Sequence, residues 1–362
     1  MNINLTCPIN NLSYGIVSLN ILRELDKQNH EITWFPIGGI DTDQSNFPLL
    51  QKCHYNTRQY DRFAHSLRIF HQFDLAQHVG KFKHVGFPIF ELDRFTPIEK
   101  SHLKNQDKLF VCSQWAKTIC EKALVSKPDI DVIPLGVDTS VFYPCKREKS
   151  IEGNPTIFLN VGKFEVRKGH QELIEAFDKA FEPTDNVMLI LCPVNVCFQS
   201  AEKLKEYNEG WFNLYKSAKL FNKIQMVDRL PNQESLAKLM NQVDYGVFPT
   251  KAEGWCLPAL ELMGCGKYVI ITKYSGQTEF CDEHNSRFIE IDETEDAYDG
   301  VFFKGQGQWA KFGEKQIEQL VETMRECHKF KQEHGVVESE SGIKTAQKFS
   351  WENTVKTLVS SL

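Results

Sequence analysis

Two glutamates lie eight positions apart, Glu253 and Glu261, in the stretch EGWCLPALE. Between them, Pro258 stands where the first turn of a helix tolerates proline, and ALELMGCG continues that helix. A helix start leaves backbone N–H groups unpaired and carries partial positive charge, so it suits a phosphate. Carboxylates nearby are good acceptors for paired sugar hydroxyls. The arrangement is therefore suited to a nucleotide sugar, with one glutamate at a transferable sugar and the other at a ribose.

The amides nearest to this predicted helix start belong to Gly254, Trp255, Cys256 and Leu257. The alternative is a solvated helix with ordinary capping glutamates, because two glutamates at this spacing occur by chance in any charged protein. Trp255 also has a second interpretation, as a side chain of the core. The pair by itself favours the solvated helix, so its surroundings have to decide.

Strand-like runs alternate with helix-like runs along the chain, which predicts parallel sheets with crossover helices. The first unit runs from MNINLTCPI through the helix IVSLNILRELDKQN to the strand EITWFPIG, and Gly15 falls in its first loop. The polar stretch 137–156, with two prolines and a charge run, predicts a linker. Beyond it the alternation restarts at TIFLNVGKF. We therefore expect two α/β halves with a ligand cleft between them.

Length and composition are those of a globular protein large enough for two domains, with 362 residues, 41% apolar and 25% charged. A net charge of −6 argues against general affinity for nucleic acids or membranes. No apolar run could span a membrane and the N-terminus lacks signal-peptide features, so we expect a cytoplasmic protein, with peripheral membrane attachment left open. The eleven cysteines include no C-x-x-C pair, which favours buried thiols over a metal site or disulfides.

Five segments resemble a known family. PTKAEGWCLPALELMGCGKYVIITKYSGQTE is similar to the donor-site motif of the retaining GT-B glycosyltransferases of family 4, which use nucleotide sugars. LNVGKFEVRKGHQELIEAF resembles the family's phosphate motif, and DVIPLGVDTSVFYP resembles its interdomain segment. FSWENTVKTLVSSL resembles the C-terminal helix that in this family crosses back onto the first domain. GVFFKGQGQWAKF resembles a subgroup of bacteria and phages.

The resemblance implies an α/β fold of the GT-B type, with two Rossmann-like domains facing a central cleft. Residues 1–150 would form an acceptor-binding domain, 151–345 a donor domain, and 346–362 the returning helix. The implied reaction moves a hexosyl or pentosyl group from a UDP-, GDP- or ADP-sugar to an acceptor hydroxyl, with retention of anomeric configuration. The oligomeric state is left open.

The resemblance also assigns roles within the donor site. Lys163 and Lys168 would contact the diphosphate, where fixed cations lower the barrier because negative charge develops on the leaving oxygen. Lys163 stands where the family usually has arginine, and it offers a point charge in place of a planar fork. Glu253 would hold the donor sugar near its reacting carbon and Glu261 the ribose. Gly15 matches a glycine that lies close to the phosphate.

Two arginines have two interpretations each. Arg167 is either a further cation of the phosphate site or a surface residue. Arg229, in VDRLPNQE, falls in the loop that in this family lies near the nucleobase, and a surface arginine is equally open.

The acceptor side departs from the family pattern. The histidine that usually follows a middle strand is not evident, and HVGFPIFELDRF offers Glu91 and Asp93 instead, while His71 in RIFHQFD is a further candidate. We expect a cell-envelope saccharide or glycolipid as acceptor, with hydroxylated bases of phage DNA as the alternative. Residues 51–105 carry nine Lys and Arg against five Asp and Glu, which suits either an anionic acceptor or a solvated face.

The family's scheme requires no metal or other cofactor. Two D-x-D triplets, at 41–43 and 129–131, are typical of metal-bound nucleotides in the other glycosyltransferase fold, but we expect neither in the nucleotide site. The same layout also supports phosphorylases and epimerases. A non-catalytic relative that only binds sugar nucleotides is the remaining alternative, and competent side chains at the main donor positions argue against it.

Overall fold

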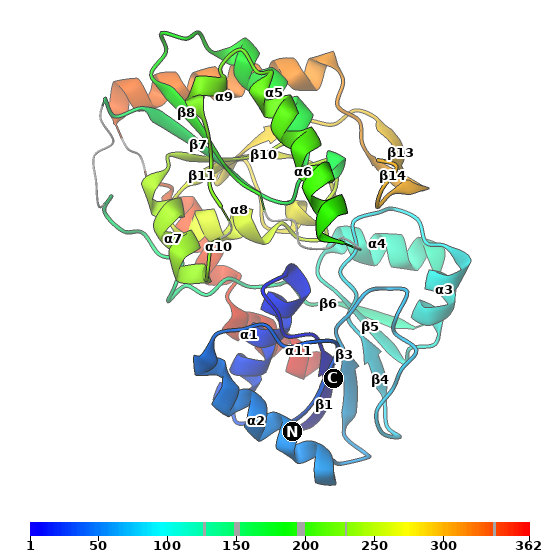
Figure 1. Cartoon of the computed structure of the whole chain (residues 1–362). Coiled ribbons are helices and arrows are strands. Elements are labelled where there is room, and N and C mark those ends of the chain that lie inside the picture. The colour runs from blue at the N-terminus through cyan, green and yellow to red at the C-terminus, as the bar shows by residue number, and fades with distance from the viewer. Residues whose placement is uncertain (126–127, 148–152, 194–199, 229, 336–337) are drawn as a thin grey trace.

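The computed structural model of the chain has two parallel β-sheets, one in each half of the sequence (Figure 1). It describes residues 1–125, 128–147, 153–193, 200–228, 230–335 and 338–362. The predicted α/β architecture with two parallel sheets is confirmed.

The first sheet has the order β2-β1-β3-β4-β5-β6, and all its neighbouring strands are parallel. Its strands are β1 (Asn2–Cys7), β2 (Glu31–Pro36), β3 (His65–Arg68), β4 (His84–Gly86), β5 (Lys108–Val111) and β6 (Asp129–Val132). The helices of this half are α1 (Ser13–Lys27), α2 (Phe47–Tyr55), α3 (Pro97–Lys104) and α4 (Gln114–Ala123), with the 3-10 turns η1 (Gln44–Asn46) and η2 (Asn56–Gln59). The strand order reverses between β1 and β3, so a crevice opens at the carboxyl ends of these two strands.

The second sheet has the order β12-β11-β10-β7-β8-β9 and is parallel throughout. Its strands are β7 (Thr156–Val161), β8 (Val187–Cys192), β9 (Ile224–Met226), β10 (Tyr245–Phe248), β11 (Tyr268–Thr272) and β12 (Ser286–Ile289). Its helices are α5 (His170–Ala180), α6 (Ala201–Lys216), α7 (Gln233–Gln242), α8 (Leu257–Gly264), α9 (Glu314–His334) and α10 (Glu340–Lys348), with the turns η3 (Val166–Lys168), η4 (Phe221–Lys223) and η5 (Ser275–Glu279). Here the order reverses between β7 and β10, which places the second crevice after these two strands.

Both sheets are covered by helices, and the sequence reflects it. All four residues of β10 are buried, and so are most of those in β1 and β7. Strands buried on both faces are near-continuous apolar runs, which is why the sequence pattern located them well. The helices between them begin at polar caps, for example Thr96 with its capping box before α3 and Ser113 before α4.

An antiparallel hairpin of β13 (Thr294–Tyr298) and β14 (Lys304–Ala310) extends from the second half toward the first. The backbone N–H of Gln308 donates to Asp93 Oδ1 at 2.7 Å, and Trp309 packs with Leu92. The segment GVFFKGQGQWAKF therefore includes an interdomain contact, which the sequence pattern did not indicate.

The last helix, α11 (Trp351–Ser361), returns to the first half and packs beside α1, as expected (Figure 1). The crossing follows α10, where Ser350 forms a bridge to Val137 and Thr354 Oγ1 donates to the Pro134 carbonyl at 2.8 Å. Gly136 is required there, since a Cβ at this position would lie 2.3 Å from the Trp351 backbone nitrogen.

The stretch 137–156 is less linker-like than its composition suggested. Phe142 is 1% exposed and belongs to the main core cluster. The expected boundary between residues 150 and 151 falls in 148–152, outside the described residues.

The described part of the chain contains no helix long and apolar enough to cross a bilayer. Ten cysteines are described, all as free thiols and all buried except Cys145, while Cys197 lies outside the described residues.

Candidate active site

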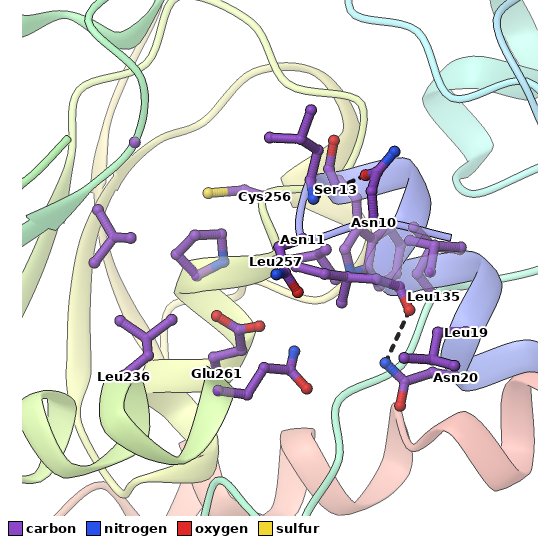
Figure 2. A pocket seen from close by; sticks show the side chains of 18 of the residues that line it. Asn10, Asn11, Ser13, Leu19, Asn20, Leu135, Leu236, Cys256, Leu257 and Glu261 are labelled. Carbon is purple, nitrogen blue, oxygen red and sulfur yellow. Dashed lines mark hydrogen bonds between the residues drawn. The ribbon is translucent and has the colours of Figure 1, made fainter. Parts of the chain in front are cut away.

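The two crevices face each other across a cavity of about 320 Å³. The loops after β1, β7 and β10 line it together with α1, α7 and the start of α8. Figure 2 shows Glu261 and Leu236, from α8 and α7, on one side, and Leu19 and Asn20 of α1 on the other. The crevices formed where the strand order reverses in each sheet therefore combine into one site built from both halves of the chain.

Helix α8 begins at this cavity. Cys256 precedes it in the left-handed conformation, with φ 70° and ψ 64°, and Pro258 lies in the first turn as predicted. The loop before the helix is fixed because Ser275 Oγ accepts from the Glu253 N–H at 2.8 Å and the Gly276 N–H donates to the Glu253 carbonyl at 2.9 Å. A Cβ on Gly276 would lie 1.9 Å from the Gly254 carbonyl oxygen, so only glycine allows this approach. The result is a helix N-terminus presented to the cavity.

The Glu253 carboxylate is held by two cations and a hydroxyl. Lys168 Nζ lies 2.5 Å from Oε1 and Arg167 Nη1 lies 3.1 Å from Oε2, while Thr250 donates its hydroxyl to Oε1 at 3.0 Å. Burial by itself would raise the pKa of Glu253, but the charges of Lys168 and Arg167 outweigh it and lower the pKa to about 2. Glu253 is therefore an ionised carboxylate facing the cavity.

Arg167 is the central cation of this cluster and is only 5% exposed. Its guanidinium donates to the Ala252 carbonyl at 2.6 Å and pairs with Glu165 at 2.9 Å. From the other half of the chain, Glu91 approaches it to 3.8 Å. Burial raises the pKa of Glu91 despite the neighbouring Arg167 charge. The interpretation of Arg167 as a surface residue is wrong: it joins the loop after β7, the loop after β10 and the first half.

Lys163 is an accessible cation of the site. Its side chain is 39% exposed and its Nζ lies 3.7 Å from Glu165. The Lys163 carbonyl is fixed from behind by His170, whose Nε2 lies 2.7 Å away, while His170 Nδ1 lies 2.5 Å from the Tyr215 hydroxyl. Since a carbonyl only accepts, Nε2 carries the proton and Nδ1 accepts from tyrosine. Burial lowers the pKa of His170 to about 4, so this neutral tautomer supports the loop at neutral pH.

Glu261 lies one turn into α8 on the wall of the cavity. Within the described part of the chain, burial is the cause that shifts its pKa, and it raises the pKa of Glu261 to about 8. The two glutamates thus differ in charge at neutral pH, because Glu253 is held by cations and Glu261 is simply buried.

A family model described as "Glycosyl transferases group 1" matches residues 145–333, just over half of the chain. The chain belongs to this family. A probable sucrose-phosphate synthase of Thermosipho melanesiensis is 25% identical over 209 residues, which cover 56% of this chain and 46% of that protein. The matched part therefore spans less than half of that relative.

Solved structures show the same fold over the whole chain. The sucrose-phosphate synthase tll1590 of Thermosynechococcus elongatus matches with a TM-score of 0.72 and 16% identity, covering 100% of this chain and 98% of the other. Anabaena Alr3699/HepE, in complex with UDP and glucose, matches with a TM-score of 0.71 and 16% identity over 100% of both chains. These likenesses confirm the GT-B fold of two Rossmann-like domains.

Of the residues predicted for the donor site, Lys163, Lys168, Glu253 and Glu261 all line the one cavity. The predicted loop residues before and at the helix start also line this cavity: Gly254, Trp255, Cys256 and Leu257. The Trp255 ring packs against Phe280 and Phe349 and is 2% exposed, so its side chain belongs to the core. Arg229 lies outside the described residues.

Gly15 is not where we expected it. It lies in the first turn of α1, not in the loop, and it is not among the cavity-lining residues. A Cβ there would lie 2.1 Å from the Asn10 carbonyl oxygen. Glycine is therefore required by a close approach within the β1–α1 connection.

The three residues predicted for the acceptor side do not lie in one place. Glu91 lines the cavity, whereas Asp93 and His71 do not. Asp93 is bonded to the hairpin through Gln308, which removes it from the site. His71 stacks on Phe73 with ring centroids 5.0 Å apart and is close enough to Lys163 for that charge to add to burial in lowering the pKa of His71.

Asp43 of the first D-x-D triplet lines the cavity, and the expectation that neither triplet belongs to the nucleotide site stays a prediction. The second triplet lies within β6, where Asp131 pairs with Lys108 at 2.9 Å. Among the described residues no group of three or more His, Cys, Asp or Glu side chains is arranged to hold a metal ion.

Sequence reasoning missed Glu165, Thr250 and His170. Glu165 and His170 lie within the segment that resembles the phosphate motif, and their neighbours gave the only available signal. The roles of these residues depend on their burial. That burial arises where the loop after β7 meets the loop after β10, which lie more than 80 residues apart in the chain; the Lys168–Glu253 hydrogen bond is one such contact.

Proposed function

We propose that this glycosyltransferase moves a sugar from a nucleotide sugar, UDP-linked in the first instance, to an acceptor hydroxyl with retention of configuration, as in family 4. One observation carries the proposal: two lysines, the start of α8, a cation-held Glu253 and a buried Glu261 share one cavity. Glu253 would face the sugar, the lysines and the start of α8 would face the diphosphate, and Glu261 would face the ribose. The UDP complex of the Anabaena neighbour supports the choice of donor.

In this proposal the diphosphate lies against the first amides of α8, with Lys163 and Lys168 beside it. Cleavage of the sugar–phosphate bond leaves extra negative charge on the leaving oxygen, and preorganised cations stabilise that charge. No metal or other cofactor enters the scheme.

Glu253 positions the donor sugar in this scheme. Both of its oxygens already interact with cations, which makes the carboxylate a weak nucleophile. Oε1 already accepts from Lys168 and Thr250, whereas Oε2 accepts only from Arg167 and has a lone pair left to accept a sugar hydroxyl. These features support a same-face reaction through an oxocarbenium-like state, in which the leaving phosphate takes the acceptor proton.

For the acceptor we propose a cell-envelope saccharide or glycolipid, which would reach the sugar from the first half near Glu91. One structural neighbour is WaaG, a glycosyltransferase involved in lipopolysaccharide biosynthesis, with a TM-score of 0.63 and 15% identity over 100% of this chain and 99% of that one. Modification of phage DNA is not favoured by any of the relatives named here.

The test is a thermal-shift and calorimetric screen of UDP-, GDP-, ADP- and CMP-sugars, with and without EDTA. A true donor raises the melting temperature because it binds only the folded state. Lys168→Ala should then slow donor turnover roughly 100- to 1,000-fold. The matched control is Lys179→Ala, at an exposed position of α5, which should retain full turnover. Unchanged turnover in Lys168→Ala would refute the leaving-group role, and no binding by any nucleotide sugar would refute the function.

A further inference from the structure

Two phenylalanines of the first half are exposed to solvent where the chain leads into strands β3 and β4. Phe63 is 72% exposed and Phe82 is 43% exposed. Each is next in sequence to exposed cations, in the stretches Arg62-Phe63 and Lys81-Phe82-Lys83. We define these five residues as the basic–aromatic face: Arg62, Phe63, Lys81, Phe82 and Lys83.

The two stretches lie side by side in the structure. The Lys81 N–H donates to the Arg62 carbonyl at 2.7 Å. Gly80 permits this approach, because a Cβ there would lie 2.8 Å from the same carbonyl oxygen. The Phe82 ring packs edge-on against His65, with ring centroids 4.9 Å apart. Backbone and ring contacts therefore join the two stretches into one surface of defined shape.

The positive charge of this face is not neutralised by its neighbours. Among the described residues, none of its three cations forms an ion pair. The adjacent Asp61 is bonded elsewhere, because its carboxylate accepts from the Phe63 N–H at 2.8 Å and from Asn2 Nδ2 at 3.2 Å. The net charge of the whole chain is −6, so this face is a local excess of positive charge on a mildly acidic protein.

The basic–aromatic face and the cavity lie at opposite edges of the first sheet. The cavity is at the carboxyl ends of its strands, whereas this face precedes β3 and β4, which are parallel to β1. Figure 1 shows the N-terminus, where β1 begins, on the side of the first half that is away from the second half. A partner bound to this face would therefore leave the cleft open.

We propose that the basic–aromatic face attaches this protein to the surface of an anionic bilayer, with both phenylalanine rings at the boundary of headgroups and acyl chains. Cations close to a membrane interact with acidic headgroups, and apolar rings beside them are buried in the interface. Stable attachment requires more than one such contribution, and this face supplies both. The inference does not depend on the nucleotide-sugar site.

A nucleic acid is the other anionic partner that cations and aromatic rings together can bind. Proteins that bind single strands stack the bases on rings along a positively charged groove that follows the backbone. The basic–aromatic face lies at the turns that lead into two strands, and none of its residues lines the cavity. A bilayer requires no groove, since exposed rings on a surface can insert into it.

The experiment is sedimentation of the full chain with vesicles of phosphatidylcholine, either alone or mixed with an equal part of phosphatidylglycerol. We expect binding to the mixed vesicles only, weakened in about 1 M NaCl, where charges are screened beyond about 3 Å. Lys81→Gln/Lys83→Gln should lower the partition coefficient about 25-fold, since each cation near an anionic surface contributes about fivefold. Phe63→Ser should lower it about tenfold by removing one ring from the interface.

Two control variants carry the same kinds of change on the second half. Lys179→Gln/Lys219→Gln removes two cations that pair with Glu175 and Glu182, so it changes the net charge by the same amount. Phe221→Ser removes a ring that is 45% exposed. Both should bind the mixed vesicles as the native chain does, and unchanged melting temperatures should show that all four variants fold.

Three results would overturn the inference. The first is the absence of vesicle binding, or equal binding to both kinds of vesicle. The second is an equal loss of binding in the test variants and the controls. The third is binding of a DNA oligonucleotide without binding of vesicles, lost in Lys81→Gln/Lys83→Gln and Phe63→Ser, which would assign the face to a nucleic acid.

Discussion

Replacing Arg167 by methionine should destabilise this protein more than almost any single change in the cleft. The guanidinium lies among three carboxylates, those of Glu165 at 2.9 Å, Glu253 at 3.1 Å and Glu91 at 3.8 Å. Methionine fills much of the same volume but leaves the carboxylates without their shared cation.

The expected decrease in the free energy of unfolding follows from the burial of these charges. Removing one partner of a buried ion pair costs about 3–5 kcal/mol, because the remaining charge stays buried without compensation. Lys168 still pairs with Glu253 in the variant, so that carboxylate is largely compensated. Glu165 is left with Lys163 at 3.7 Å, a longer contact to a partly exposed side chain. We therefore expect the lower end, about 3 kcal/mol at pH 7, a large share of the 5–15 kcal/mol typical of a folded domain.

The assay is equilibrium unfolding in urea, at neutral pH and at several acidic pH values. Arg167 is among the charges that lower the pKa of Glu165, after burial alone would have raised it. A carboxylate with a lowered pKa in the folded state stabilises the protein above its usual pKa, and this stabilisation is lost as the pH falls through the lowered value. The difference between native and Arg167→Met protein should therefore be largest near neutrality and shrink in acid.

Two controls make the result interpretable. Lys179→Met removes an exposed cation whose partner Glu175 is also exposed, and it should leave the unfolding free energy unchanged within error. The double variant Arg167→Met/Glu165→Gln should recover part of the loss, because the stranded carboxylate is gone. A loss below about 1 kcal/mol, or a full loss with no recovery in the double variant, would refute the buried-charge argument.

Two further predictions concern Glu261 and the glycine of the helix start. Ribose hydroxyls that donate to Glu261 favour its ionised form, so nucleotide binding should release a proton near pH 7, where the raised pKa of about 8 keeps the free carboxyl protonated. Calorimetry in buffers of different ionisation enthalpy measures this release, and Glu261→Gln should abolish it; heats independent of buffer would contradict the assignment. In Gly254→Ala the new methyl would lie 2.6 Å from Ile89 Cγ2 of the first half, so X-ray scattering should show a more open molecule with slower turnover. The control Gly39→Ala has open space around its Cβ, and an equally compact Gly254→Ala molecule would disprove the contact.

Local regularities were enough to predict the elements of this fold. The β7 run TIFLNV is apolar because it is buried on nearly every side, and alternation with amphipathic helices implies parallel sheets. Pro258 predicted the start of α8 because, within a helix, proline is tolerated in the first turn. The motif residues of the second half could likewise be assigned, since Lys163, Lys168, Glu253 and Glu261 line one cavity.

Tertiary structure decided the charge states and several roles. The sequence around Arg167 is compatible with a surface arginine, and only the approach of the loops after β7 and β10 buries it among carboxylates. Glu253 and Glu261 are chemically identical in sequence, yet cations hold one ionised while burial alone keeps the other protonated. Arg23 and Asn46 lie 23 residues apart and meet at the cavity only because α1 and η1 fold together. Types and spacings of residues therefore determined the elements and the class of site. What each residue can do was determined by its burial and by its charge partners, because both arise from contacts between distant segments.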